Sequence, residues 1–323
     1  MAYSSQIVRR ARQRLERMRA DRESQNRERL LTAYNQVPRI RQIDLQLRQT
    51  MALAAQAAFT QGSRDLMEQA KQKNLTLQEE KKQLIAQHFG DGWLDERPIC
   101  PVCGGSGYMG TQMCSCLKAL CVEEQEKELM LLGHGSEEFS KFRLDYYPDR
   151  IDPKLGRSMR AIMQRTFELC RQYADSFSPL SGNLLFSGDT GLGKTFLSAC
   201  IAKVVAGKGY SVVYESAPHL FAKLEKARFQ NDEEARQEAE KFARCDLLIL
   251  DDLGTEMPGM FTTSALYTLV NDRILGQKAT IISTNLSTDA LDSRYSAQVA
   301  SRLRGDFRRV AFVGEDIRVL KGR

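Results

Sequence analysis

Hydrophobic residues follow different patterns in the two halves of this sequence. In residues 4–35, apolar positions separated by four and three residues predict a polar helix with one narrow apolar stripe. Pro38 is expected to interrupt this helix. The same spacing then resumes with coiled-coil periodicity, and a further helix is predicted over residues 66–89. The stripe positions are Ile7, Ala11, Leu15 and Met18, followed after Pro38 by Ile40, Ile43, Leu47, Met51, Ala54 and Ala58.

From about Phe139 the pattern changes to short apolar runs that alternate with helical segments. Runs of this length and composition predict buried strands. Strand–helix alternation indicates an α/β fold with a parallel sheet between two helical layers. The expected strands are Leu184–Ser187, Ser211–Glu215, Leu247–Asp251, Ala279–Thr284 and Arg309–Val313.

Composition limits the function classes only loosely. A chain of 323 residues is long enough for about two domains. The formal net charge of +6 permits nucleic-acid binding without requiring it. Arginines crowd the first thirty positions, and they form either a solvated helix face or a nucleic-acid contact. They are Arg9, Arg10, Arg12, Arg14, Arg17, Arg19, Arg22, Arg27 and Arg29.

No apolar run approaches the roughly 20 residues of a membrane span, so no membrane association is expected. The N-terminus lacks the apolar core of a secretory signal, which favours a cytoplasmic location with reduced cysteines.

Residues 188–195, GDTGLGKT, fit the phosphate-binding loop pattern G-x-x-x-x-G-K-[ST]. A strand-like run, Asn183–Ser187, precedes the loop and a helix-like run, Phe196–Ala202, follows it. In this context backbone N–H groups can point at phosphate oxygens, which makes a chance glycine-rich turn a weak alternative. We expect Lys194 to reach the β- and γ-phosphates of ATP and the Thr195 hydroxyl to bind Mg²⁺. The nucleotide-contacting residues would be Gly188, Asp189, Thr190, Gly191, Leu192, Gly193, Lys194, Thr195 and Phe196.

Four apolar residues, Leu247–Leu250, end in the carboxylates of Asp251 and Asp252. A buried parallel strand brings such a pair to the edge of the sheet where ligands bind. Asp251 is expected to hold Mg²⁺ through water, and Asp252 to activate the attacking water. Many enzymes of this type carry glutamate at the second position, so the shorter Asp252 leaves the hydrolysis rate open. The alternative is a strand that simply ends in solubilising carboxylates. Asn285 follows the next strand and could orient the water.

A cysteine cluster with the spacing C-x2-C-x10-C-x-C precedes the α/β half. Four thiolates in two close pairs suit tetrahedral Zn²⁺ in a structural role. Glycines beside the first pair allow backbone N–H groups to approach sulfur. A redox pair and unligated cysteines are the alternatives, and Cys121 could replace one ligand. The zinc ligands would be Cys100, Cys103, Cys114 and Cys116.

Residues from about Phe139 to Arg323 resemble the AAA+ ATPases of the DnaC/DnaI helicase-loader group, with the transposition helper IstB as close kin. By the family pattern, Asn285 matches sensor 1 and Arg318 matches the sensor 2 arginine acting in cis. Arg302 matches the arginine finger that reaches a neighbouring subunit's nucleotide. The motifs are GDTGLGKT at 188–195, LLILDDLGTE at 247–256, Leu269–Arg273, IISTNLS at 281–287 and Ala300–Leu303.

The resemblance implies an ATP-dependent loader of a replicative hexameric DNA helicase onto single-stranded DNA, with self-association through the ATP site and slow, regulatory hydrolysis. The expected domains are a partner-binding helical region at 1–95, a four-cysteine zinc module at 96–122 and an AAA+ ATPase domain at 135–323. The cysteine module is similar to that of DnaI-like loaders.

Other functions remain open. An IstB-like helper would act on double-stranded DNA with a transposase. An interaction module could bind nucleotide without turnover. A chaperone-like zinc adaptor fits less well, because such proteins repeat the C-x2-C-x-G-x-G unit. The long N-terminal helices indicate either partner binding or helices packed on their own domain.

Overall fold

The computed structural model describes residues 3–57, 64–96, 98–131, 136–152, 156–230 and 233–321. It divides the chain into two compact units. The first consists of Met1–Arg12 and Leu117–Arg323, and the second consists of Gln13–Cys116. The expected apolar position Ala58 lies outside the described residues.

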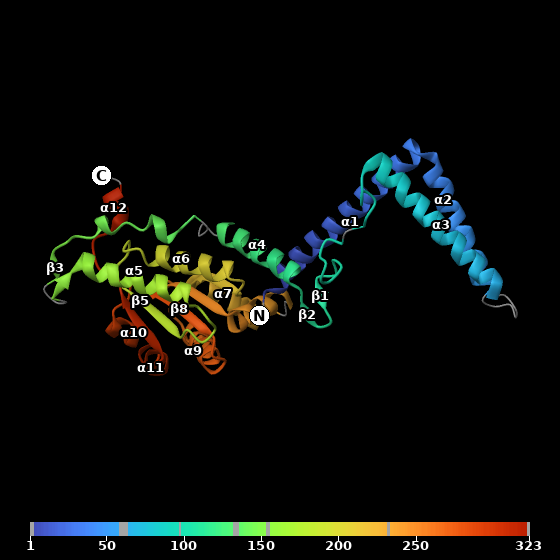
Figure 1. Cartoon of the computed structure of the whole chain (residues 1–323). Coiled ribbons are helices and arrows are strands. Elements are labelled where there is room, and N and C mark those ends of the chain that lie inside the picture. Colours follow the sequence, from blue (N-terminus) through green and yellow to red (C-terminus); the bar gives the residue numbers. More distant parts are fainter. Residues whose placement is uncertain are drawn as a thin grey trace. The chain divides into compact units, whose positions relative to one another are not determined.

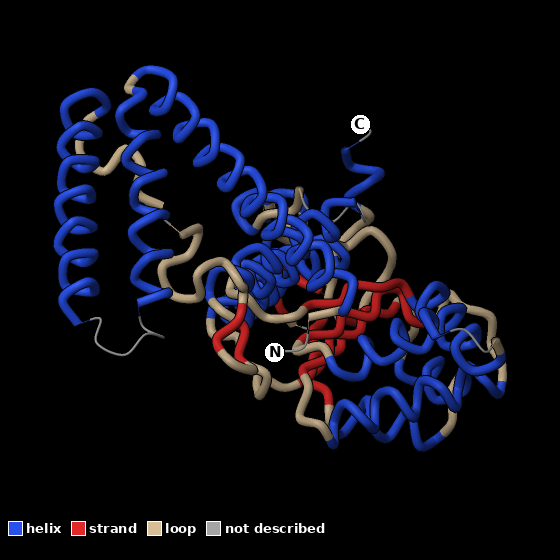
Figure 2. Tube along the Cα trace, turned by 90° about the vertical axis from the view of Figure 1, so that its right-hand side faces the viewer, coloured by secondary structure: helices blue, strands red, loops and turns tan. Residues whose placement is uncertain are grey.

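A five-stranded sheet forms the centre of the first unit (Figures 1 and 2). Its strand order is β6-β7-β8-β5-β9, and neighbouring strands run parallel. The predicted α/β class with a parallel sheet is thereby confirmed. The strands are β5 (Asn183–Ser187), β6 (Val212–Ser216), β7 (Leu247–Leu253), β8 (Ala279–Thr284) and β9 (Phe307–Ala311).

Helices cover both faces of this sheet. Successive residues of a strand point to opposite sides, so an apolar strand presents a face on each side that helices bury. Leu184 and Phe186 of β5 contribute to one apolar core, with α5 (Met159–Asp175) and α6 (Lys194–Gly207). Leu185 contributes to the other, with helices that follow β6, β7 and β8. The predicted three-layer arrangement is confirmed. The second layer comprises α7 (Ala217–Phe229), α8 (Glu233–Arg244), α9 (Met260–Leu275), α10 (Thr288–Arg294) and α11 (Ala297–Gly305).

Short elements complete this unit. A C-terminal helix, α12, follows β9, and two 3-10 turns and a small hairpin precede α5. Their bounds are η1 (Phe139–Lys141), η2 (Leu144–Tyr146), β3 (Ile151–Asp152), β4 (Arg157–Ser158) and α12 (Ile317–Lys321).

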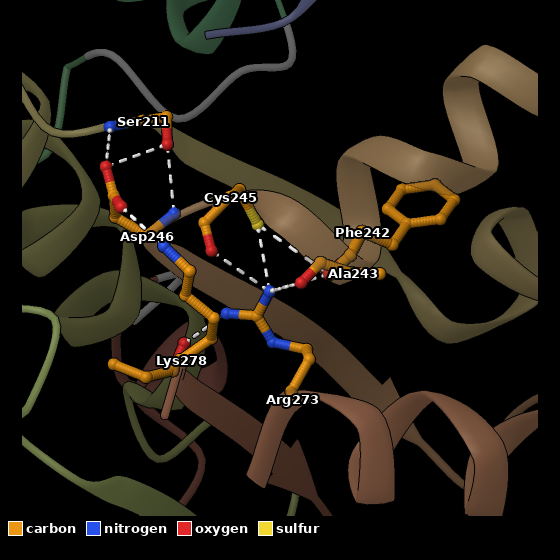
Figure 3. Close-up of polar contacts among 8 residues, drawn as sticks. Ser211, Phe242, Ala243, Cys245, Asp246, Arg273 and Lys278 are labelled. Atoms are coloured by element: carbon orange, nitrogen blue, oxygen red, sulfur yellow. Dashed lines mark hydrogen bonds and ion pairs between the residues drawn. The ribbon is translucent and has the colours of Figure 1, made fainter. Parts of the chain in front are cut away.

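At the amino ends of β7 and β8 the side chain of Arg273, from α9, is fully buried (Figure 3). Its Nη1 donates to the carbonyl oxygens of Phe242 (2.6 Å) and Cys245 (3.1 Å). Its Nε donates to the Thr280 hydroxyl (2.9 Å), and Nη2 donates to the Ala279 carbonyl (2.5 Å). One guanidinium group therefore joins the end of α8 to the start of β8.

The first turns of α1 (Ser5–Gln36) belong to the same unit as the sheet. Ile7 and Ala11 are buried, and the Tyr3 hydroxyl donates to the Gly209 carbonyl at 2.7 Å. Arg10 pairs with Glu128 of α4 (Ser115–Leu131) at 2.5 Å. The sequence pattern showed the apolar stripe but not that its beginning packs on the α/β unit.

The second unit contains most of α1 together with α2 (Pro38–Ala57) and α3 (Arg64–Phe89), so the predicted helical N-terminal region is confirmed. Ion pairs join the first half of α2 to the second half of α3. Lys81 Nζ lies 2.7 Å from Asp44 Oδ1, and Arg39 Nε lies 2.7 Å from Glu80 Oε1. A small hairpin of two two-residue strands, β1 (Tyr108–Met109) and β2 (Gln112–Met113), follows these helices.

Among the described residues, no helix has the length and apolar character that crossing a membrane requires.

Candidate functional site

A cavity of about 610 Å³ lies at the carboxyl ends of β5, β7 and β8, the edge where ligands bind in parallel α/β sheets. Most of the residues expected at a nucleotide site line this one cavity. Residues 190–196 of the loop and helix start are among them, whereas Gly188 and Asp189 lie outside the lining. The expected residues with functional side chains in this lining are Lys194, Thr195, Asp251, Asp252, Asn285 and Arg318.

The loop between β5 and α6 curls around the floor of the cavity. Two of its glycines have left-handed backbone angles and no room for a side chain. A Cβ at Gly188 would lie 2.2 Å from the Phe312 carbonyl oxygen, and one at Gly191 would lie 1.9 Å from the Asp316 carboxylate. The α6 helix begins directly after this loop at Lys194, so its amino end faces the cavity.

The Lys194 ammonium group is held by three oxygen atoms. It donates to the carbonyls of Gly188 and Asp189, each at 2.7 Å, and to Asn285 Oδ1 at 2.5 Å. Burial lowers the pKa of Lys194, and the carboxylates of Asp252 and Asp251 oppose that shift. A phosphate oxygen would replace one of these acceptors without leaving the cation unpaired.

The buried Asp251 carboxylate accepts hydrogen bonds from three hydroxyl groups. Its Oδ2 accepts from Thr195 Oγ1 (3.0 Å) and from the hydroxyl of Tyr214 (2.8 Å). Its Oδ1 accepts from the hydroxyl of Ser283. The Thr195–Asp251 pair offers the hard oxygen ligands that Mg²⁺ prefers. Sequence reasoning found this pair and missed Tyr214 and Ser283, because both read as ordinary strand residues.

Asp252 has a left-handed backbone with φ of 55°. The pairing of β7 with β8 shifts register between Leu250 and Leu253, so the chain bulges here. The Asp252 N–H donates to Ser283 Oγ at 2.9 Å, while its carboxylate faces the cavity. Burial raises the pKa of Asp252, and repulsion by Asp251 raises it further. A strained residue with a raised carboxyl pKa is a typical feature of an active site.

The two arginines expected at the site lie in different places. Arg318 lines the cavity, directly after the Ile317 N–H that donates to the Gly191 carbonyl at 3.0 Å. Arg302 lies on α11, outside the lining residues, where its Nη2 donates to Asn271 Oδ1 at 3.0 Å.

Aromatic residues form one wall of the cavity, and sequence reasoning did not identify them. Phe142 and Tyr147 stack with ring centroids 5.7 Å apart. The fully buried Tyr147 donates its hydroxyl to the Leu192 carbonyl at 2.9 Å, which fixes the loop between β5 and α6 to this wall.

The four cysteines of the C-x2-C-x10-C-x-C pattern come together in the second unit. Their sulfur atoms all lie within 4.8 Å of one another, and the Gly107 N–H donates to Cys103 Sγ at 3.3 Å. Burial alone would raise the pKa of Cys103, but hydrogen bonds from Gly107 and Cys116 outweigh it and lower that pKa to about 6. The donor set fits tetrahedral thiolate ligation. Among the described residues, Cys121 is not part of this group.

The chain is similar to several known proteins. Residues 168–302 match the family model of IstB-like ATP binding proteins. The putative insertion sequence ATP-binding protein y4pL of Sinorhizobium fredii is 27% identical over 56% of this chain and 72% of its own length. The replicative helicase loader DnaC of Escherichia coli is 24% identical over 42% of this chain and 55% of its own, so the match spans about half of that loader. The match to the crystal structure of the DnaC helicase loader covers 56% of this chain and 99% of that one, at 20% identity and a TM-score of 0.47.

The chain therefore carries an IstB-like ATP-binding domain, homologous to DnaC-type loaders and to ATP-binding proteins of insertion sequences. Proteins of this family are AAA+ ATPases, and the predicted ATPase class is confirmed.

Proposed function

We propose that this protein is an ATP-dependent loader of a replicative hexameric DNA helicase onto single-stranded DNA. The observation that carries the proposal is the four-sulfur cluster that precedes the ATPase domain, in a chain whose cavity is lined by Lys194, Thr195 and Asp251. Helicase loaders stand among its relatives, DnaC of Escherichia coli and DnaI of Bacillus subtilis.

The cavity at the carboxyl edge of the sheet would bind ATP. Residues 188–196 would surround the phosphates with backbone N–H groups, and Lys194 would exchange one of its carbonyl partners for a phosphate oxygen. Thr195 and Asp251 would hold Mg²⁺, which neutralises phosphate charge during phosphoryl transfer.

Asp252 and Asn285 would act on the attacking water, since both face the cavity beside the end of β7 and β8. Arg318 would contact the phosphates in cis. Arg302 lies outside its own chain's cavity, which supports the role of an arginine finger for a neighbouring subunit. Nucleotide binding and self-association would then be one linked equilibrium.

The cysteine cluster would hold one structural Zn²⁺ through Cys100, Cys103, Cys114 and Cys116. We expect metal analysis of the purified protein to find about one zinc ion per chain. Replacing Cys100 and Cys103 by serine should abolish it, whereas replacing Cys170 by serine, a buried cysteine in α5, should not. A folded protein without metal would contradict the zinc module.

The helical region 1–95 and the zinc module 96–122 would dock on the helicase, and the ATPase domain 135–323 would contact DNA. Since Tyr3, Ile7 and Ala11 pack on the sheet unit, removal of the N-terminal region would also uncover part of that unit.

One other function has specific support. The match to protein y4pL spans more of this chain than the match to DnaC, which favours a transposition helper that acts on double-stranded DNA with a transposase.

The test is a size-resolved binding assay of the full chain with the hexameric helicase of its own organism, with and without ATP and Mg²⁺. A complex that depends on ATP, and that is lost in Lys194→Ala and weakened in Arg302→Ala, is the expected result. Absence of any complex in every nucleotide state would contradict the loader. Binding to double-stranded DNA together with a transposase would then establish the alternative.

A further inference from the structure

Strand β6 contributes a hydroxyl group to the nucleotide site, although no residue of β6 was expected there. The Tyr214 hydroxyl lies 2.8 Å from Asp251 Oδ2 and 3.3 Å from the hydroxyl of Ser198. Ser198 in turn donates to the Lys194 carbonyl at 2.7 Å. Tyr214 therefore joins the first turn of α6 to the carboxylate at the end of β7.

The ring of Tyr214 and its hydroxyl serve different needs. The ring is part of the apolar core between the sheet, α5 and α6, and a phenylalanine ring would fill the same space. A buried hydroxyl contributes nothing to that packing and needs a hydrogen-bond partner. Here its partner is a carboxylate, and hydrogen bonds to charged groups are the strong ones.

Two hydroxyl groups hold the Asp251 carboxylate, one on each of its oxygen atoms. Tyr214 donates to Oδ2 and Ser283 donates to Oδ1, so rotation of the carboxylate would break both bonds. In the orientation they hold, Oδ2 lies 3.0 Å from Thr195 Oγ1. These two oxygen atoms are the pair that would hold Mg²⁺.

We propose that Tyr214 is a positioning residue of the nucleotide site, whose hydroxyl, together with that of Ser283, fixes Asp251 in the orientation that serves Mg²⁺. The proposal rests on the ATP site described under the proposed function. Tyr214 would act through Asp251, because among the described residues it is not part of the cavity lining. Loss of its hydroxyl weakens the nucleotide binding that depends on Mg²⁺. Binding without metal, which depends on the phosphate loop and Lys194, stays unchanged.

The experiment compares Tyr214→Phe with the wild type by fluorescence titration with N-methylanthraniloyl-ATP, first in EDTA and then with increasing Mg²⁺. We expect equal affinity in EDTA and an increase of about tenfold in the Mg²⁺ concentration needed for half-maximal tightening, as is usual when a group behind a metal ligand is lost. Ser283→Ala should shift the Mg²⁺ titration in the same direction.

The matched control is Tyr173→Phe, in α5. It removes another buried tyrosine hydroxyl, which lies away from the cavity and donates to the Gly182 carbonyl at 2.9 Å. It should leave both affinities unchanged. Thermal melting of all variants shows whether they fold.

Three outcomes would overturn the proposal. A Tyr214→Phe protein with a wild-type Mg²⁺ titration removes the positioning role. Equal weakening with and without Mg²⁺ shows a merely structural role. If the wild type binds no nucleotide in either condition, the ATP site itself is wrong and the proposal falls with it.

Discussion

The two ends of one sheet hold buried charged groups in opposite ways. At the amino ends of β7 and β8, Arg273 donates to backbone carbonyls and to Thr280, and its network is closed. At the carboxyl ends, Lys194, Asp251 and Asp252 line an open cavity.

The difference shows that the amino ends of the strands stabilise the fold, whereas the carboxyl ends can bind a ligand. Removing Arg273 would leave carbonyl oxygens buried without donors, which is costly. The charged groups at the cavity can exchange their hydrogen-bond partners for a ligand. Their charges therefore contribute more to ligand affinity than to the stability of the fold.

The largest effect on stability is expected from Arg273→Met. Loss of a fully buried, multiply bonded charge should lower the free energy of unfolding by about 3–5 kcal/mol. Urea denaturation measures it, and Arg171→Met on the exposed face of α5 is the control, with an expected change below about 1 kcal/mol.

If Arg273→Met does not fold, Arg273→Lys keeps the charge with fewer donors and should be intermediate. A wild-type denaturation midpoint for Arg273→Lys would show that the planar array of donors is unimportant. Nucleotide affinity of whichever variant folds should stay near that of the wild type.

At the carboxyl ends of the strands, Asp252→Asn should remove the proposed general base. ATP hydrolysis should then slow by about 10²–10⁴-fold while nucleotide binding persists. The base is active when deprotonated, and burial beside Asp251 raises the pKa of Asp252. Wild-type hydrolysis should therefore fall, as the pH is lowered, at a higher pH than an ordinary aspartate would give. The measurement is a pH–rate profile.

The same substitution should not destabilise the fold. A carboxyl pKa raised in the folded protein means that the ionised form is disfavoured there at neutral pH. Asp252→Asn should then melt at the wild-type temperature or above it, and Asp175→Asn at the end of α5 should leave hydrolysis unchanged. Full hydrolysis by Asp252→Asn would show that another group activates water.

Much of the cavity at the carboxyl ends of the strands could be predicted from sequence, because its residues follow short motifs. Lys194 and Thr195 close a loop of fixed spacing, and Asp251 and Asp252 end an apolar run. Parallel strands bring such ends to the same edge of a sheet. The α/β class and the helical N-terminal region followed from periodicity for the same local reason.

The rest depended on tertiary contacts. The position of Tyr214 in β6 indicates a face of the sheet but not the neighbour across it. Arg273 ends the Leu269–Arg273 motif of the resemblance, but an arginine in a helix usually indicates exposure, so its burial was not predicted. The spacing of Ile7 and Ala11 indicated an apolar helix face, but not which part of the chain covers that face.

A smaller effect is expected from Lys194→Ala. Loss of a charge-assisted contact to phosphate should weaken ATP binding by about 10–100-fold. Because burial lowers the pKa of Lys194, its cation is already disfavoured in the folded protein, and stability should change little. Isothermal titration calorimetry measures the binding. The control is Lys203→Ala on the same helix, where Lys203 pairs with exposed Glu138 at 2.8 Å. Unchanged binding would contradict the phosphate-loop assignment.

The smallest effect on stability is expected from Lys278, a partly exposed residue beside the Arg273 network at the amino ends of the strands. Lys278 lies 3.0 Å from the buried Asp246, which also accepts from the Ser211 N–H at 3.0 Å (Figure 3). Lys278→Ala should cost about 1 kcal/mol, because water can replace part of the lost contact and Ser211 remains.

The pH dependence of that cost tests its origin. Burial alone would raise the pKa of Asp246, but the hydrogen bonds from Ser211 and Lys278 outweigh it and bring the pKa below the ordinary value of 3.8. A lowered carboxyl pKa contributes stability that is present above the unfolded pKa and is lost as the pH falls through the folded value. The difference between wild type and Lys278→Ala, measured by urea denaturation, should therefore persist at pH 5 and shrink below about pH 3.8. A difference independent of pH would assign the contribution of Lys278 to its aliphatic chain instead.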